Sequence, residues 1–137
     1  VRPRPGLALA GVNDPVVSHY GGYGNATPDV AAAFRASRPG DFRILLEHRP
    51  ENFRANVARH GVDLQLSGHT HGGIAPLIDR VVARLNEGFV RGLYREGDSA
   101  LYVNPGVGLW AGFPLRFLDP AEITVFTLRP SRQTQKD

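Results

Sequence analysis

The chain has 137 residues, a formal net charge of +3 and a hydrophobic fraction of 42%. This length matches one ordinary domain with a sizeable core, and no apolar run of about 18 residues is present that would span a bilayer. The absence of cysteine excludes disulfides, thiolate zinc sites and cysteine nucleophiles, so any metal must be held by nitrogen and oxygen atoms.

The charge distribution does not indicate a nucleic-acid-binding surface. Residues 129–137 carry +2 of the net charge, which leaves +1 for the rest of the chain. Lys136 is the only lysine, and we interpret this preference for arginine as a compositional bias. We therefore expect no stable nucleic-acid partner; an arginine-rich surface that binds DNA in a salt-sensitive manner is the least favoured alternative.

The first predicted elements are a strand, a helix and a second strand. Gly6 to Pro15 is a short apolar run that ends in turn residues, which is typical of a buried strand. Thr27 before Pro28 predicts the start of a helix that must end before Pro39. Phe42 to His48 is the second predicted strand.

A helix and a third strand follow without a long connection. Pro50 to Gly61 predicts a helix with basic residues in its last turn, and Val62 to Gly68 predicts a strand. Strand, helix and strand within about 26 residues indicate a parallel sheet with a right-handed crossover.

The second half of the chain has a different pattern. Apolar residues at helical spacing from Leu77 to Leu85 predict an amphipathic helix. Residues 89–103 predict a hairpin with Glu96 to Asp98 at its turn. Glu122 to Leu128 predicts a last strand, and we expect residues 129–137 to form a polar, disordered tail.

Three histidines stand at the carboxyl ends of predicted strands: His48 after one strand, and His69 and His71 after the next. Ligands bind at that edge of open α/β sheets. Residues two apart in an extended chain point the same way, and neutral imidazoles are good ligands for zinc, iron, manganese and nickel. We therefore predict that all three are metal ligands. His19 and His60 lack this context, and we expect them to be structural or exposed.

The segments ILLEHRPE and GVDLQLSGHTHGG resemble the C-terminal half of the calcineurin-like metallophosphoesterase superfamily, closest to its bacterial membrane-linked phosphodiesterase-like branch. GHTHGG is the specific element, and the later GVG and PAEITVFTL follow in the order that this branch shows. The resemblance implies an α/β fold over residues 1–128. The expected architecture is the C-terminal half of a four-layer α/β/β/α sandwich, with a mixed sheet and flanking helices.

The resemblance also implies a metal-dependent phosphoric ester hydrolase with a dinuclear centre. Two divalent ions, such as Mn, Fe or Zn, activate a water molecule for in-line attack on a phosphoester substrate. His48 and His69 resemble ligands of one ion, and His71 resembles a ligand of the other. No catalytic side chain is assigned in this chain, because the nucleophile is water.

The remaining ligands of the superfamily lie in Asp-x-His, Gly-Asp and Gly-Asn-His motifs, for which this sequence has no satisfactory match. The sequence begins at Val1 without a methionine or a signal peptide, so we expect it to be the later part of a longer protein. The activity is then expected of the intact parent. Membrane association in bacteria, through a segment N-terminal to this chain, is a further expectation from the resemblance.

Glu47 departs from the pattern of this branch, which has a small residue before the histidine. Strand alternation puts its side chain on the face opposite His48, where we expect it to be solvated, or alternatively bonded to a neighbouring imidazole. The alternative to an enzyme is a catalytically inactive module that binds one zinc ion through the same histidines.

Overall fold

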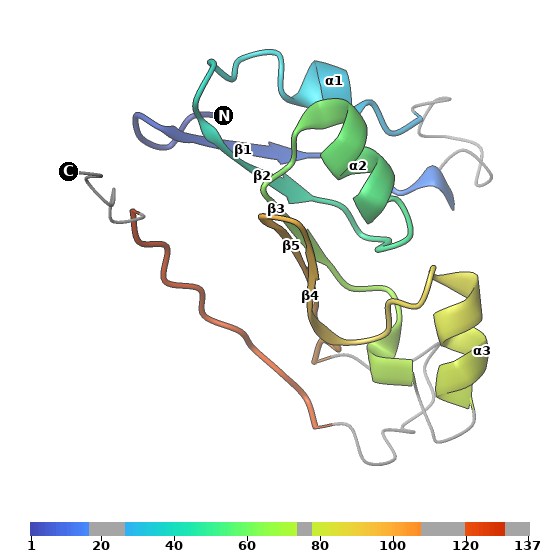
Figure 1. The fold of residues 1–137 in the computed structure, drawn as a ribbon. Helices are drawn as coiled ribbons and strands as arrows, with labels where there is room; N and C mark the ends of the chain where they lie inside the picture. The colour runs from blue at the N-terminus through green and yellow to red at the C-terminus, as the bar shows by residue number, and fades with distance from the viewer. Residues whose placement is uncertain (17–26, 74–77, 108–119, 131–137) are drawn as a thin grey trace.

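A mixed sheet of five strands forms the centre of the described structure (Figure 1). This computed structural model describes residues 1–16, 27–73, 78–107 and 120–130. The strands are β1 (Leu7–Gly11), β2 (Phe42–Leu46), β3 (Leu64–Ser67), β4 (Gly92–Glu96) and β5 (Ser99–Val103). The helices are α1 (Val30–Ala33), α2 (Phe53–His60), α3 (Ile78–Leu85) and a short 3-10 helix, η2 (His71–Gly73).

The strand order in space is β1-β2-β3-β5-β4. The pairs β1/β2, β2/β3 and β3/β5 are parallel, whereas β4 and β5 form the expected antiparallel hairpin. The predicted α/β fold with a mixed sheet and flanking helices is therefore confirmed. The arrangement is consistent with the C-terminal half of the expected sandwich.

Local signals explain most helix ends. Gly61 adopts a left-handed conformation with φ 59° and closes α2, since its N–H donates to the carbonyl of Val57 at 3.1 Å. Helix α1 is shorter than predicted, and its N-cap is Asp29 instead of Thr27. The Asp29 carboxylate accepts from the N–H of Ala32 at 2.8 Å, so the cap lies two residues later than the sequence suggested.

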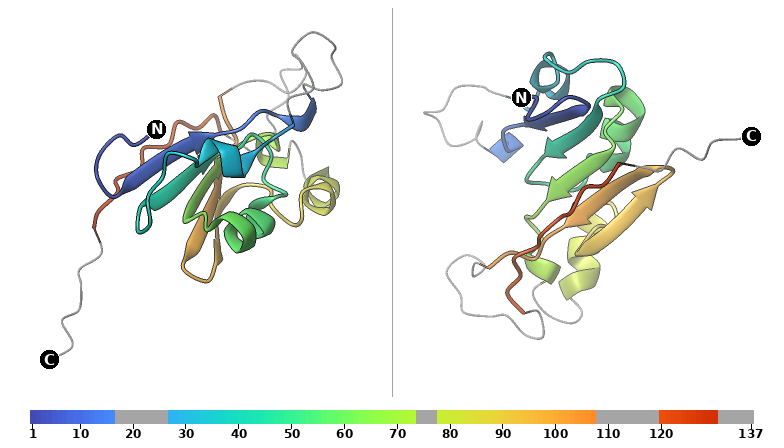
Figure 2. Two further views of the ribbon diagram at one scale, coloured as in Figure 1. Left: turned by 90° about the horizontal axis from the view of Figure 1, so that it is seen from above. Right: turned by 90° about the vertical axis from the view of Figure 1, so that its left-hand side faces the viewer.

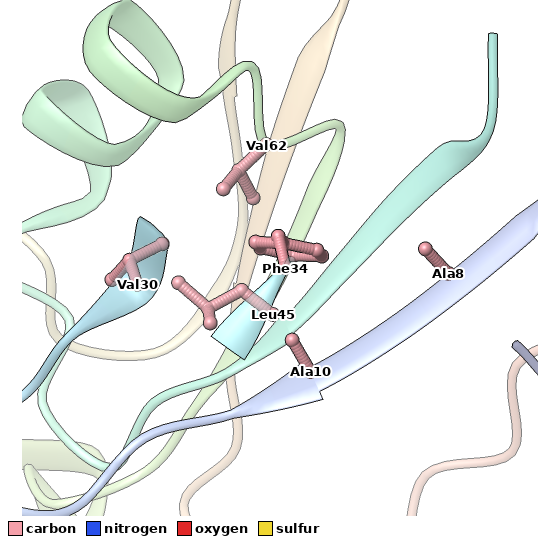
Figure 3. Packing of buried hydrophobic residues seen from close by; sticks show 6 residues of the cluster. All are labelled: Ala8, Ala10, Val30, Phe34, Leu45 and Val62. Carbon is pink, nitrogen blue, oxygen red and sulfur yellow. The ribbon is translucent and has the colours of Figure 1, made fainter. Parts of the chain in front are cut away.

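Helices α1 and α2 cover one face of the sheet (Figure 2). Figure 3 shows the first cluster on this face, in which α1 and the residues after it pack on β1, β2 and the approach to β3. Its buried members are Ala8, Ala10, Val30, Phe34, Leu45 and Val62. The small alanines of β1 leave room for Phe34, which follows α1 directly.

A second cluster lies where α2 meets the hairpin. Phe53 of α2 packs with Phe89, Leu101 and Val103, and all four side chains are at most 3% exposed. The rings of Phe53 and Phe89 meet edge to face with centroids 5.9 Å apart. This cluster anchors α2 over β5, so α2 bridges the two halves of the sheet.

The opposite face of the sheet is apolar and only partly covered. Alternation turns Phe42 and Leu46 of β2 away from the helices, and these side chains are 41% and 43% exposed. Leu93 of β4 is 56% exposed. Residues 120–130 run along this side (Figure 2), where Phe126 meets the ring of Tyr102 with centroids 5.1 Å apart.

The predicted strand from Glu122 to Leu128 is wrong, because no strand forms between residues 120 and 130. A backbone bond from Glu122 N to Gly106 O at 3.1 Å and several side-chain bonds hold the segment: Tyr102 donates to the carboxylate of Glu122, and the Asn104 amide donates to the hydroxyl of Thr124 at 2.7 Å. Ile123 and Val125 are 85% and 86% exposed, so the apolar alternation that suggested a strand has no covering layer here.

Helix α3 is amphipathic as predicted, but its apolar stripe faces outward. None of its residues is buried, and Ile78, Val81 and Leu85 are 47%, 59% and 73% exposed. Among the described residues, no helix has the length and apolar character needed to cross a membrane. The expected tail, residues 131–137 in particular, lies outside the described residues.

Two neighbouring leucines provide a test of this burial pattern. Leu45 is fully buried among the helices, and Leu46 on the open face is 43% exposed. In the 137-residue chain, Leu45→Ala should lower the free energy of unfolding by about 2–5 kcal/mol through cavity formation, and Leu46→Ala by about 1 kcal/mol or less. Urea denaturation of both variants measures this; equal losses would contradict the assignment of faces.

The open apolar face also predicts the solution behaviour of the chain. A contiguous exposed apolar surface favours association, so the isolated chain should bind an apolar dye such as ANS and self-associate as its concentration rises. Replacing Leu46 and Leu93 by lysine should reduce both effects. A monodisperse wild-type monomer that binds no dye, seen by size-exclusion chromatography with light scattering, would rule this out.

Candidate metal centre

Polar side chains gather at the carboxyl edge of the three strands β1, β2 and β3. Asp14 follows β1, His48 follows β2 and His69 follows β3. Because these strands are neighbours and parallel, their carboxyl ends meet at one edge of the sheet. The edge is tightened by two backbone bonds beyond the strands, from Glu47 N to Leu66 O at 3.2 Å and from Gly68 N to His48 O at 3.0 Å.

His48 and His69 face each other across this edge. The Nε2 atom of His48 lies 3.3 Å from the Nδ1 atom of His69, and the rings meet at 74°. Two nitrogens bound to one tetrahedral zinc ion at about 2.0–2.1 Å each lie about 3.3–3.4 Å apart. The spacing and the chemistry of this pair therefore fit one divalent ion.

The turn that carries His69 has an unusual backbone. His69 and His71 have φ values of 71° and 48°, which non-glycine residues seldom adopt. Gly73 has φ 90°, and a Cβ atom there would lie 2.9 Å from the Cβ atom of Asp79. Thr70, at 3% exposure, fixes the turn from inside because its hydroxyl donates to the carbonyl of Val90. The fold thus sustains local strain where the histidines stand.

Asp14 and Arg49 flank the pair. Arg49 Nε donates to Asp14 Oδ1 at 2.9 Å, and Val16 N donates to the same oxygen at 3.0 Å. Asp14 Oδ2 lies 3.7 Å from His48 Nε2. Burial pushes the pKa of Asp14 upward, but the N–H of Val16 and the guanidinium of Arg49 outweigh it, so the pKa lies below its usual value.

Asp14 is one of the turn residues that end the first predicted strand. It does cap the turn through Val16, but it also reaches the histidine edge. The same signal that singled out the histidines, a position at the carboxyl end of a predicted strand, applies to Asp14 and identifies it as a neighbour of the site.

The electrostatic surroundings keep His69 neutral. Burial lowers its pKa first, and the positive charges of Arg49 and of a protonated His48 lower it further, against smaller opposing effects of Glu51 and Asp14. A neutral imidazole is the form that binds a metal ion. The lowered pKa therefore favours the metal-binding form of the ring.

The predicted ligand His71 lies in η2 and does not join the pair. Within the described residues, no group of three or more His, Cys, Asp or Glu side chains is arranged to hold a metal ion. Metal ligation by His48, His69 and His71 thus stays a prediction. His60 closes α2 away from the edge, and His19 lies outside the described residues.

The expectation that Glu47 is solvated is wrong: its side chain is only 3% exposed. It does not contact an imidazole either. Its carboxylate accepts from the side-chain amides of Asn52 at 3.0 Å and Asn56 at 2.5 Å. Burial raises the pKa of Glu47 above its usual value, although the two amides act in the opposite direction. Glu47 is buried because α2 packs over the end of β2 and covers this face of the sheet.

Known proteins that resemble the chain carry metallophosphoesterase names. It is 40% identical over 111 residues to "Uncharacterized metallophosphoesterase" of Helicobacter pylori, which covers 80% of this chain and 29% of that protein. The chain is 42% identical over 94 residues to "Uncharacterized metallophosphoesterase YkuE" of Bacillus subtilis, and the match covers 64% of this chain and 31% of that protein. The chain is 40% identical over 128 residues to "Transmembrane protein with metallophosphoesterase domain" of Bos taurus, and the match covers 90% of this chain and 28% of that protein.

The chain thus spans about three tenths of the length of these relatives. No family model matches it, and no solved structure gives a significant match.

The lowered pKa of His69 predicts how stability depends on pH. In the unfolded chain His69 takes up a proton near pH 6.5, whereas in the folded chain it does so only at lower pH. The contribution of His69 to the free energy of unfolding is therefore present above about pH 6.5 and is lost as the pH falls below that value. In metal-free chain, His69→Asn should flatten the change in urea midpoint between pH 7.5 and 5.5. Asparagine suits the left-handed backbone at this position.

His60→Asn serves as the control for removing an imidazole elsewhere. If His69→Asn leaves the slope of stability against pH as steep as in wild type, the inferred environment of His69 is incorrect.

Proposed function

The chain belongs to the calcineurin-like metallophosphoesterase superfamily, and we propose that it supplies part of a metal centre that hydrolyses phosphoric esters. The observation that carries this proposal is the His48–His69 pair, whose nitrogens lie 3.3 Å apart at the carboxyl edge of the sheet. Similarity to relatives named metallophosphoesterases over most of the chain supports the same chemistry.

His48 and His69 hold one divalent ion in this proposal, and His71 holds a second. Mn, Fe or Zn suits such nitrogen ligands. The lowered pKa of His69 leaves its ring neutral and ready to bind near neutral pH. Thr70 and the bonds between the ends of β2 and β3 hold the backbone that carries the two rings, which limits reorganisation when an ion binds.

A bound pair of ions supplies Lewis acidity and lowers the pKa of a coordinated water molecule, which is the nucleophile in such centres. The side chains of this chain act by binding and orientation. Arg49 donates to Asp14 and so keeps that carboxylate ionised beside His48. The negative charge of Asp14 opposes the repulsion between two cationic centres at this edge.

The whole protein's activity is a proposal for a longer polypeptide that includes this chain, because the chain matches only 28–31% of the length of its relatives. Ligands that complete the two sites come from the rest of that polypeptide. The substrate is a phosphodiester or phosphomonoester. Two relatives are named transmembrane proteins, and we propose that this protein is also associated with a membrane through a segment outside residues 1–137.

A second candidate function is a catalytically inactive module that binds one metal ion. The arrangement of the described residues favours it in one respect: His48 and His69 approach each other closely, but no group of three or more His, Asp or Glu side chains among these residues is arranged to hold a metal ion. Two imidazoles alone bind zinc weakly, so this module would hold less than one equivalent of metal.

The two functions differ in a direct measurement. The full-length protein with Mn²⁺ should hydrolyse bis(p-nitrophenyl) phosphate, and His69→Ala should lower kcat/KM at least about 100-fold, because loss of an outer-shell partner alone costs about 10–100-fold. His60→Ala, which removes an imidazole away from the edge, should retain wild-type activity. Full-length protein that binds Mn²⁺ without any turnover would favour the inactive module.

A further inference from the structure

We propose that Glu47 is a positioning residue that holds the imidazole of His48 opposite His69. The expected effect of Glu47 on metal binding rests on the proposed function, whereas its expected effect on the position of the His48 ring does not. The inference comes from a network of buried polar side chains that the metal centre itself does not use.

Glu47 is tied to the start of α2. Its side chain is 3% exposed, and its two oxygens accept from different amides, those of Asn52 at 3.0 Å and Asn56 at 2.5 Å. Asn52 is the N-cap residue of α2, yet its side chain makes no capping bond. An amide that would ordinarily cap the helix is therefore directed to Glu47.

The network continues into the strand that carries the other histidine. Asn56 Nδ2 also donates to Gln65 Oε1 at 2.9 Å, and Gln65 Nε2 donates to Ser67 Oγ at 3.1 Å. Gln65 is fully buried, and Ser67 is the last residue of β3. One chain of bonds thus connects the end of β2, helix α2 and the strand that leads to His69.

The residue after His48 is also bonded to its neighbours, through both its carbonyl and its side chain. The carbonyl of Arg49 accepts from Gln65 Nε2 at 3.4 Å and from Ser67 Oγ at 3.5 Å, and its guanidinium donates to Asp14. The side chain of His48, by contrast, is 52% exposed. The exposed ring contacts His69 and lies near Asp14, and the two anchored residues on either side of His48 hold the backbone from which the ring reaches them.

A carboxylate has a specific advantage at this position. Burying it costs free energy that an apolar residue would not cost, and only a complete set of donors offsets that cost. A fully satisfied buried network also selects one geometry. Glutamine keeps one acceptor oxygen, so one of the two bonds from the asparagine amides would be lost. Alanine removes both bonds and leaves the Asn56 amide only its bond to Gln65.

The test compares full-length wild type with Glu47→Ala, Glu47→Gln, Asn52→Ala and a control, Val62→Ala. Val62 is fully buried at the opposite end of β3, so its truncation destabilises the fold without touching the network. Two readouts are taken: the imidazole NMR signals of His48 in metal-free protein, and the Zn²⁺ affinity by isothermal titration calorimetry.

Glu47→Ala should shift the His48 signals and weaken Zn²⁺ binding about 10–100-fold. Glu47→Gln should restore part of both, Asn52→Ala should cause an intermediate change, and Val62→Ala should resemble wild type in both readouts. Asn52→Ala and Glu47→Gln keep the test decisive if Glu47→Ala does not fold.

The inference is overturned if Glu47→Gln and Asn52→Ala leave the His48 signals at their wild-type positions, or if Val62→Ala shifts them equally. If the proposed metal centre is wrong, the titrations give a different result: either the wild type binds no Zn²⁺, or Zn²⁺ binding survives the His69→Ala substitution. In that case the signals of metal-free protein still decide whether Glu47 positions His48.

Discussion

The parallel register of β1, β2 and β3 is the constraint on which the candidate site depends. Ala10 lies beside Leu45, and Leu45 lies beside Gln65, so the three strands end level with one another. Residues from distant parts of the chain then meet at one edge: His69 lies 21 residues after His48, and Arg49 lies 35 residues after Asp14. A shift of one residue in the pairing of β2 and β3 would turn these side chains to the other face.

The helix-covered face of the sheet has an unusual composition near this edge. Part of it is apolar, with Leu45 and Val62 fully buried. A polar part begins beside Leu45, with Gln65, Glu47 and Asn56 all at most 5% exposed. Such a layer costs desolvation and gives little net stability, but it restricts the ends of β2 and β3 to one arrangement. The apolar residues of this face thus stabilise the fold, and the polar residues fix the positions of the strand ends.

The two faces of the sheet differ in how they are covered. One is covered by α1 and α2, while the other presents partly exposed leucines and a segment held by side-chain bonds (Figure 2). The chain matches only 29% and 31% of the length of two relatives, which therefore have more polypeptide with which to cover such a face.

The sequence by itself determined the elements whose signals are local. The apolar runs of β2 and β3, the Gly61 stop of α2, the turn of the hairpin and the grouping of the histidines at strand ends could all be read from neighbouring residues. The same local reading failed for the segment from Glu122 to Leu128, since alternation predicts a strand but cannot supply a pairing partner.

Only the tertiary structure decided that His48 faces His69, that Asp14 reaches the same edge and that Glu47 is buried beneath α2. The physical reason is the same in each case. Strand pairing and the docking of a helix bring together residues far apart in the chain, and burial and charge at one residue depend on which distant groups arrive beside it.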